Sequence, residues 1–187
     1  MENPSNYSNW VIVDDNNKNV LIQGAYPHVK RKKRKEHLDL LLQLNINVFV
    51  NLCEPHERNI NENYEKYINF ICESQHQQHP KYYQCPILDM DVTSEFELDI
   101  IVNKIVCEFQ NGDGARIYVH CKGGHGRSSM VLSCVIMKLF NNYNAEWAIL
   151  TIKEKHDTRT VRPHLFMNEK QISEVQKYAS RHLSSSE

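Results

Sequence analysis

The sequence predicts an α/β fold in which a single domain holds a central, mostly parallel or mixed sheet flanked by helices. Short runs rich in β-branched residues alternate along the chain with segments whose apolar residues recur at helical spacing. No internal repeat and no linker interrupts this alternation. The length of 187 residues, of which 41% are hydrophobic, also fits one ordinary globular domain.

The first half of the chain is expected to form a hairpin and then alternating helices and strands. Two short apolar runs, 11–13 and 20–22, flank a turn-rich stretch, which is typical of two strands joined by a turn. Residues 1–9 are polar and are expected to fray. The patterns that follow predict a helix over 36–44, a buried strand over 48–52, a helix over 62–73 and a strand over 82–88 that ends in an acidic loop.

The second half is expected to begin with a helix opened by Ser94, because Glu97 stands at the capping-box position three residues later. A strand over 116–120 follows, and a glycine-rich loop comes directly after it. The folded domain is expected to span 10–182, with a disordered tail over 183–187. Three further helices are predicted over 127–140, 145–155 and 168–181.

Charge and cysteine usage narrow the class of protein. The 22 basic and 23 acidic residues give a net charge of −1, which does not indicate a protein that coats nucleic acid. Any site that binds an anion must therefore come from a local cluster of charge. No run approaches the roughly 18 apolar residues of a membrane span, and the N-terminus lacks the pattern of a signal peptide. Six scattered cysteines without a C-x-x-C pair predict free thiols in a reducing compartment, the cytoplasm or the nucleus.

The feature that carries chemistry is the loop between the strand over 116–120 and the next helix. Three of the six glycines of the chain fall within it. Glycines allow a tight turn whose successive N–H groups point into one concavity, and the following helix adds the positive end of its dipole. This nest suits a phosphate dianion, which would be held by the loop residues Lys122, Gly123, Gly124, His125, Gly126 and Arg127.

Three side chains of this loop could perform nucleophilic phosphoryl transfer. Cys121 begins the nest, where its thiolate would be stabilised. Arg127 lies six residues later, and its planar fork can hold two phosphate oxygens while the thiolate attacks phosphorus. Ser128 places a hydroxyl near the sulfur, where it can help the thiolate leave. The alternative is an inert buried cysteine beside a structural turn.

A strand, a cysteine, five residues with glycines, an arginine and a hydroxyl before a helix resemble the signature of the cysteine-dependent protein tyrosine phosphatases. The loop His120–Ser128 and the chain length are similar to the dual-specificity subgroup. The resemblance implies a protein tyrosine phosphatase-like fold and a phosphocysteine intermediate, without metal or cofactor. It also implies that His120 orients the loop rather than transferring protons.

The leaving oxygen needs a proton, so an acid is expected on a separate loop. Asp89 follows the strand predicted over 82–88, and its offset from the preceding apolar residues fits the pattern of the family. Asp91 is close enough to take the same role, because the loop can differ in length. We favour Asp89, with Asp91 as the alternative.

The expected substrate is a phosphorylated protein, carrying phosphotyrosine and phosphoserine or phosphothreonine. Lys122 and the titratable His125 are basic side chains of the loop, which resembles in this respect phosphoinositide phosphatases of the tensin-homologue and mitochondrial types. Enzymes of the same fold that act on RNA 5′ phosphates usually carry His-Gly-x-Asn-Arg-Thr-Gly, from which this loop departs. A non-catalytic phosphate-binding module is the remaining alternative.

Two further features leave their roles open. The six consecutive basic residues over 30–35 fit a nuclear address, an anionic-lipid patch, a docking site or a plain solvated surface. Cys53 follows a strand expected beside the loop, so it is a candidate for a disulfide with Cys121 under oxidation.

Overall fold

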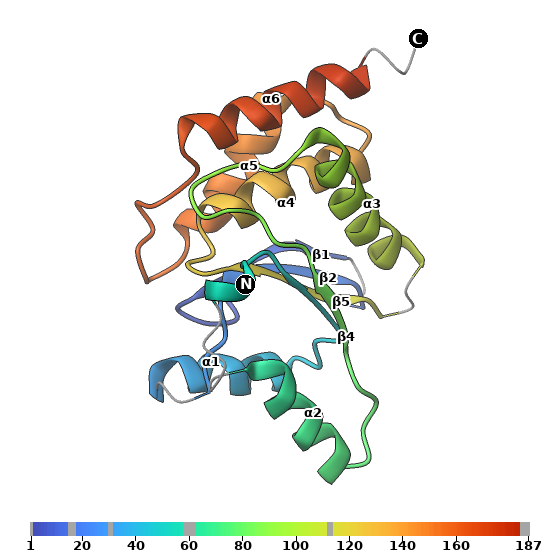
Figure 1. Ribbon diagram of the computed structural model, residues 1–187, viewed down its shortest axis with the longest axis vertical. Coiled ribbons are helices and arrows are strands. Elements are labelled where there is room, and N and C mark those ends of the chain that lie inside the picture. The colour runs from blue at the N-terminus through green and yellow to red at the C-terminus, as the bar shows by residue number, and fades with distance from the viewer. Residues whose placement is uncertain (1, 15–17, 30–31, 58–62, 112–113, 184–187) are drawn as a thin grey trace.

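The computed structural model describes residues 2–14, 18–29, 32–57, 63–111 and 114–183. In the described part, five strands form one sheet in a single α/β domain, as the sequence predicts (Figure 1). The strands are β1 (Ser8–Val13), β2 (Val20–Ala25), β3 (Val48–Asn51), β4 (Lys81–Gln84) and β5 (Arg116–Cys121). The helices are α1 (Lys32–Gln43), the 3-10 turn η1 (Pro55–Glu57), α2 (Tyr64–Ser74), α3 (Glu95–Asn111), α4 (Gly126–Leu139), α5 (Ala145–Asp157) and α6 (Glu169–Leu183).

The sheet is mixed and mostly parallel. Its strand order is β1-β2-β5-β3-β4, with β1 antiparallel to β2 and every other pair parallel. The predicted hairpin is thus the pair β1 and β2. Because β2, β3 and β5 are parallel, their carboxyl ends meet at one edge, where Ala25 and Cys121 lie opposite each other in the register.

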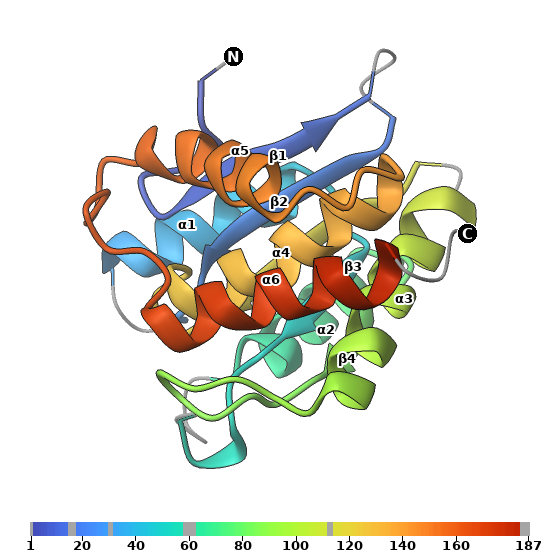
Figure 2. The same cartoon turned by 90° about the horizontal axis from the view of Figure 1, so that it is seen from above.

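Helices cover both faces of this sheet. Helices α1 and α2 pack on one face, and α3 to α6 pack on the other, with α6 lying across α4 (Figures 1 and 2). Alternate side chains of the strands enter two apolar clusters, because successive residues of a strand point to opposite faces. In β3, for example, Val50 belongs to the cluster beneath α4 and Phe49 to the cluster beneath α1 and α2.

Several boundaries differ from those expected; α1, for example, begins at Lys32 and not at residue 36. β4 ends at Gln84, although a strand over 82–88 was predicted, because its partner β3 ends at Asn51; the N–H groups of Cys85 and Ile87 still donate to the carbonyls of Asn51 and Leu52, at 2.9 and 3.1 Å. At the N-terminus, β1 begins at Ser8, inside the segment expected to fray, and both Ser8 and Asn9 are buried. This segment is structured because it pairs with β2, where Ser8 lies opposite Gly24. Most of the expected tail lies outside the described residues.

The capping box predicted for the third long helix is present. Ser94 Oγ accepts a hydrogen bond from the N–H of Glu97 at 3.3 Å, and the Glu97 carboxylate accepts one from the N–H of Ser94 at 3.4 Å. Two N–H groups at the start of α3 are thereby satisfied. The cap fixes where the chain leaves the loop over 85–94, which carries both candidate acids.

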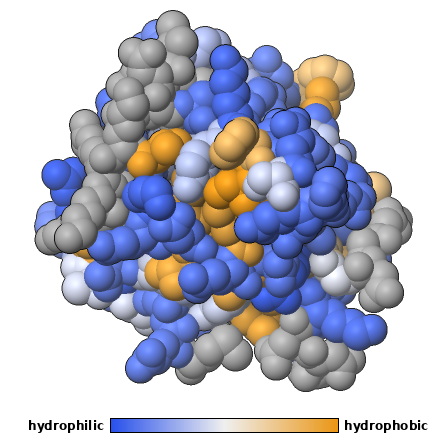
Figure 3. All heavy atoms as spheres, turned by 90° about the horizontal axis from the view of Figure 1, so that it is seen from below, coloured by the Kyte–Doolittle hydropathy of each residue, from blue (hydrophilic) through white to orange (hydrophobic). Residues whose placement is uncertain are grey.

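The face formed by α1 and α2 is mostly hydrophilic, with small patches of apolar side chains (Figure 3). Leu40 on α1 and Phe70 on α2 are among the exposed apolar residues of these helices. No helix in the described part of the chain has the length and apolar character needed to cross a bilayer.

Candidate active site

The loop that joins β5 to α4 holds Cys121 at the carboxyl edge of the sheet. The cysteine is the last residue of β5, and only 3% of its surface is exposed. The N–H of Gly124 donates to its Sγ at 3.2 Å, and Ser128 Oγ lies 3.4 Å from the same sulfur. Backbone amide, hydroxyl and the start of α4 thus converge on one sulfur atom, an arrangement that stabilises negative charge.

The backbone conformation of this loop depends on Gly124. Its φ of +75° is a left-handed conformation, and a Cβ there would lie 2.3 Å from the carbonyl oxygen of Gly24. Gln23 on β2 holds the same turn, because its Nε2 donates to the Gly124 carbonyl at 3.0 Å and to Ser129 Oγ at 2.7 Å. The side chain of Gln23 is fully buried, so these bonds form away from water.

Arg127 extends from the first turn of α4 into the pocket, where 98% of its surface is covered. Its Nη1 donates to Glu57 Oε2 at 2.6 Å and to the Ile87 carbonyl at 2.9 Å, and its Nη2 donates to Glu57 Oε1 at 2.9 Å. Burial opposes charge on both partners, but the hydrogen bonds between them hold the pKa of Glu57 below its ordinary value and raise that of Arg127. The guanidinium is therefore charged and fixed in direction.

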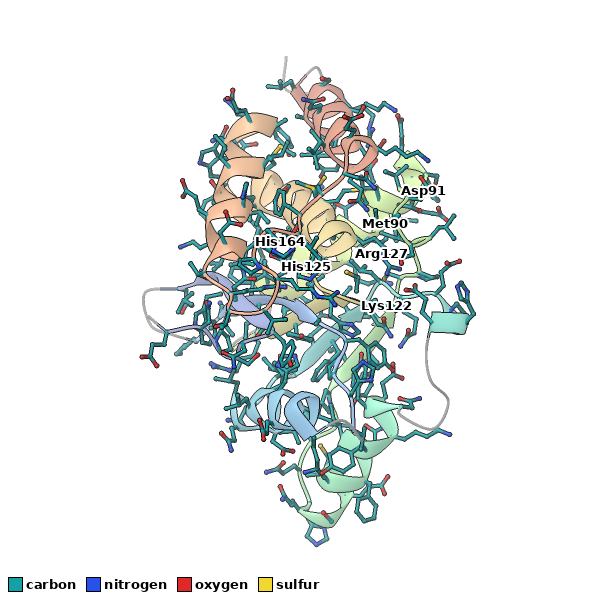
Figure 4. All side chains as sticks on the ribbon, turned by 90° about the vertical axis from the view of Figure 1, so that its left-hand side faces the viewer. Met90, Asp91, Lys122, His125, Arg127 and His164 are labelled. Carbon is teal, nitrogen blue, oxygen red and sulfur yellow. The ribbon has the colours of Figure 1, made fainter. Side chains whose placement is uncertain are left out.

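Asp89 and Asp91 have different partners. Asp89 Oδ1 lies 2.8 Å from Nη2 of Arg127, and the aspartate is about half exposed. Asp91 instead lies 3.2 Å from Lys170 Nζ at the start of α6, and this contact holds its pKa below the ordinary value. The carbonyl of Asp91 also accepts a hydrogen bond from Gln171 at 3.2 Å. The structure thus brings Asp89, and not Asp91, beside Arg127. In Figure 4 the label of Asp91 stands beyond that of Met90 as seen from Arg127.

His120, the residue before the cysteine, lies beneath the loop and is fully buried. Its Nε2 is 2.8 Å from the hydroxyl of Tyr64 on α2, and its ring packs edge-on against Tyr26 and Tyr64. Its ring stacks on Tyr118 with the centroids 5.5 Å apart. This position is suited to orienting the strand end rather than to contacting a substrate.

Most of the loop residues line one pocket of about 170 Å³ above Cys121. Lys122 is exposed on the outer side of the loop and is not among the lining residues (Figure 4). No group of three histidine, cysteine or acidic side chains in the described residues could hold a metal ion. The lining residues are Asp89, Met90, Cys121, Gly123, His125, Gly126, Arg127, Leu165, Phe166 and Gln171.

Three contributors to the site were missed by sequence reasoning. Glu57 lies in a short 3-10 turn far from the motif, and nothing in its surroundings marks it as the partner of Arg127. Gln23 could have been suspected only as a polar residue inside an apolar strand. His156 on α5, which lies 2.8 Å from His125, carries no local signal.

The structure assigns no role to the basic run over 30–35 or to Cys53. Residues 30 and 31 lie outside the described residues, and α1 begins at Lys32. Lys35 forms an ion pair with Asp39 at 3.2 Å. Cys53 and Cys121 are both buried, and no disulfide joins them in the structure. The oxidative disulfide between them remains a prediction.

The comparison with known protein families identifies the domain. The family described as "PTP-SAK: Swiss Army Knife protein, DSP-PTPase phosphatase domain" matches residues 15–174, which includes the whole loop and its partners. The chain belongs to this DSP-PTPase phosphatase domain family. The resemblance seen in the loop His120–Ser128 is therefore confirmed over most of the chain.

Similar proteins agree with this placement of a DSP-PTPase domain. A viral protein of Invertebrate iridescent virus 6, named as a tyrosine phosphatase (197R), is 30% identical over 119 residues, which are 60% of this chain and 37% of that protein. The chain thus spans little more than a third of this curated relative. The fold matches PTPMT1, solved in complex with PI(5)P, at a TM-score of 0.70 with 17% identity, over 97% of this chain and 99% of that one. It also matches kinase associated phosphatase at a TM-score of 0.67 with 17% identity, over 95% and 96%.

Proposed function

We propose that this chain hydrolyses phosphate monoesters through a phosphocysteine intermediate. The observation that carries the proposal is that Cys121, Arg127 and Asp89 line one small pocket, with Asp89 2.8 Å from Arg127 Nη2. A nucleophile, a fixed cation and an acid on a separate loop are the three parts that phosphoryl transfer requires.

In the first step, the Cys121 thiolate attacks phosphorus and a sulfur–phosphorus bond forms. The bond between phosphorus and the ester oxygen breaks, and Asp89 gives its proton to that oxygen. Arg127 and the loop amides hold the remaining phosphate oxygens while charge develops on them. Since Nη2 of Arg127 lies 2.8 Å from Asp89, a phosphate bound in the pocket would compete with this carboxylate for the guanidinium.

In the second step, a water molecule attacks the phosphorus of the intermediate. Asp89, now a carboxylate, takes a proton from this water, and the sulfur–phosphorus bond breaks. The departing thiolate is stabilised by Ser128 Oγ and by the N–H of Gly124, which lie 3.4 Å and 3.2 Å from the sulfur. The enzyme returns to its starting state, and inorganic phosphate leaves.

We favour phosphorylated proteins as substrates, including phosphotyrosine and phosphoserine or phosphothreonine. Family membership supports this class, and so do apolar residues at the pocket, Met90, Leu165 and Phe166, which suit the carbon skeleton of an amino-acid side chain. A second candidate is a phosphoinositide. The basic residues Lys122 and His125 in the loop favour it, and the similar structure of PTPMT1 was solved with PI(5)P.

The test is phosphate release from a matched panel with Cys121→Ser as the blank. The panel holds phosphotyrosine and phosphothreonine peptides, phosphoinositide head groups and 5′-triphosphate RNA. Release from peptides above the blank supports the proposal, and preferential release from head groups supports the second candidate. No release from any member, with retained phosphate binding, would replace both with a phosphate-binding module.

A further inference from the structure

Two histidines are joined beside the pocket. His125, in the loop after Cys121, lines the pocket, and its Nδ1 lies 2.8 Å from Nε2 of His156 on α5. The two rings meet edge to face with their centroids 5.1 Å apart. These residues are 31 positions apart in sequence, and their contact ties the phosphate loop to α5.

His156 is held as a neutral ring. Its side chain is completely buried, and Phe166 packs against it at 5.6 Å between centroids. Burial, with a further contribution from the charge of Arg159, lowers the pKa of His156 to about 4. The Asp157 carboxylate lies 3.5 Å from its Nδ1, which favours a proton on that nitrogen. The other nitrogen, Nε2, then accepts a hydrogen bond from Nδ1 of His125.

The opposite edge of the His125 ring faces the phosphate loop. A Cβ placed on Gly123 would lie 2.6 Å from Cδ2 of His125 and 3.2 Å from its Nε2. Nδ1 is thus directed at α5, while Nε2 lies against the loop that surrounds the anion site. The labels in Figure 4 place His125 between His164 and Arg127 in that view.

We propose that His156 positions His125 as a proton-dependent cation of the phosphate pocket, so that a bound phosphoanion is held more tightly when His125 is protonated. The inference rests on the proposed function, since it concerns how the same pocket holds its substrate. His156 fixes the proton on Nδ1 of His125, and uptake of a second proton at Nε2 gives an imidazolium beside the anion. The preferred substrate is then a phosphoester that carries full negative charge next to the loop.

The charged groups around His125 and His156 are compatible with protonation of His125 as the step that changes anion binding. On the pocket side stand Arg127, Asp89 and the Cys121 thiol, and on α5 stand Asp157 and Lys153, which form an ion pair with each other. Arg159 acts on His156 from the segment after α5. Histidine is the residue type whose unperturbed charge change falls between about pH 5 and pH 8, and the Cys121→Ser substitution removes the thiol from the pocket.

The experiment measures sulfate binding to the Cys121→Ser variant by calorimetry across about pH 5 to 8. Sulfate keeps its two charges throughout this range, and the serine removes the titration of the thiol. We expect the dissociation constant to fall roughly tenfold from the alkaline to the acid end, the size expected for one added charge close to the anion. By reciprocity, sulfate should shift the titration of the His125 ring, followed by ¹⁵N NMR, toward higher pH.

Four variants in the same background separate the roles. His125→Gln should remove the pH dependence, and His125→Lys should keep tight binding at both ends of the range. His156→Phe should move the transition to lower pH, and His156→Gln, whose amide oxygen can still accept a hydrogen bond, should restore it. His164→Gln is the matched control, because this exposed histidine does not line the pocket, and it should leave the profile unchanged.

Failure of the inference and failure of the proposed function give different results. A dissociation constant that does not change with pH, or an unchanged profile in His125→Gln, overturns the inference while hydrolysis by the wild type stands. If His156→Phe does not fold, the NMR titration still decides, and a His125 ring whose titration sulfate leaves unmoved contradicts the inference. Absence of both sulfate binding and hydrolysis would instead remove the proposed function.

Discussion

The carboxylate of Glu57 contacts both terminal nitrogens of Arg127, with Oε2 2.6 Å from Nη1 and Oε1 2.9 Å from Nη2. Both side chains are almost completely buried. Such a two-point contact fixes the plane of the guanidinium before any substrate arrives, so its direction costs nothing at the moment of reaction. Arg127 can still meet a phosphate, because Nη2 also faces Asp89 at the pocket.

Replacing Glu57 with glutamine should therefore reduce both activity and stability. We expect kcat/KM to fall by 10-fold or more, and the free energy of unfolding to fall by about 3 kcal/mol, since a buried charge loses its partner. Urea unfolding and steady-state kinetics measure the two effects. Glu54→Gln is the matched control, because Glu54 lies in the same segment and contacts His56 at 3.8 Å instead of Arg127. Equal effects of both variants would contradict the assigned role.

The same pair predicts how stability depends on pH. The folded-state pKa of Glu57 lies below its ordinary value of 4.5, so its contribution is fully present above that value. The contribution is lost as the pH falls below 4.5 and through the folded-state pKa, because the protonated acid no longer pairs with Arg127. Unfolding free energies measured along an acid series should fall less steeply in Glu57→Gln than in the wild type. Parallel curves would show that Glu57 titrates alike in both states.

The two candidate acids can be separated by conservative substitutions. Asp89→Asn should lower kcat by about 10²–10⁴-fold for alkyl phosphates, whose leaving oxygen needs a proton, and less for aryl phosphates. Asp91→Asn should have little effect on kcat, because Asp91 pairs with Lys170 on α6. Steady-state rates of both variants with alkyl and aryl phosphates show which aspartate is the general acid. If Asp91→Asn shows the loss and Asp89→Asn does not, the proposed acid is wrong.

Gly124 and Gly114 offer a matched test of the loop. Both have positive φ, +75° and +79°, but a Cβ on Gly114 meets nothing within 4 Å, whereas one on Gly124 meets the backbone of Gly24 at 2.3 Å. Gly114→Ala should cost about 1 kcal/mol of stability and leave activity intact. Gly124→Ala should cost several times more and abolish phosphate binding, because the loop must move. Thermal unfolding and phosphate titration measure the two effects in both variants. Similar losses in Gly114→Ala and Gly124→Ala would show that the loop conformation does not depend on Gly124.

The order of elements and the centre of the site followed from local patterns. The strand β3 (Val48–Asn51) falls within the β-branched run predicted over 48–52, and the loop after Cys121 is recognisable from its glycines together with Cys121, Arg127 and the strand and helix on either side. Ser128 lies in the first turn of α4, with its Oγ 3.4 Å from the sulfur of Cys121, as its place directly after the loop predicts. The capping residues Ser94 and Glu97 are also local signals, and they were read correctly.

What the sequence could not reveal are contacts made by folding across long separations. Glu57 and Arg127 are 70 residues apart, and His125 and His156 belong to different elements. No periodicity encodes such pairs, because they arise only when the sheet brings its carboxyl edge together. The choice between Asp89 and Asp91 was open for the same reason, since it depends on how the loop meets α6.

The proposed mechanism depends on a covalent bond between Cys121 and phosphorus. The most direct measurement is acid quenching of the wild-type enzyme during turnover of an aryl phosphate, followed by peptide mapping with mass spectrometry. We expect a peptide that carries one added phosphoryl group on Cys121, which is absent from Cys121→Ser and accumulates when Asp89→Asn slows its hydrolysis. Turnover without any phosphorylated Cys121, or with the phosphoryl group on another residue, would contradict it.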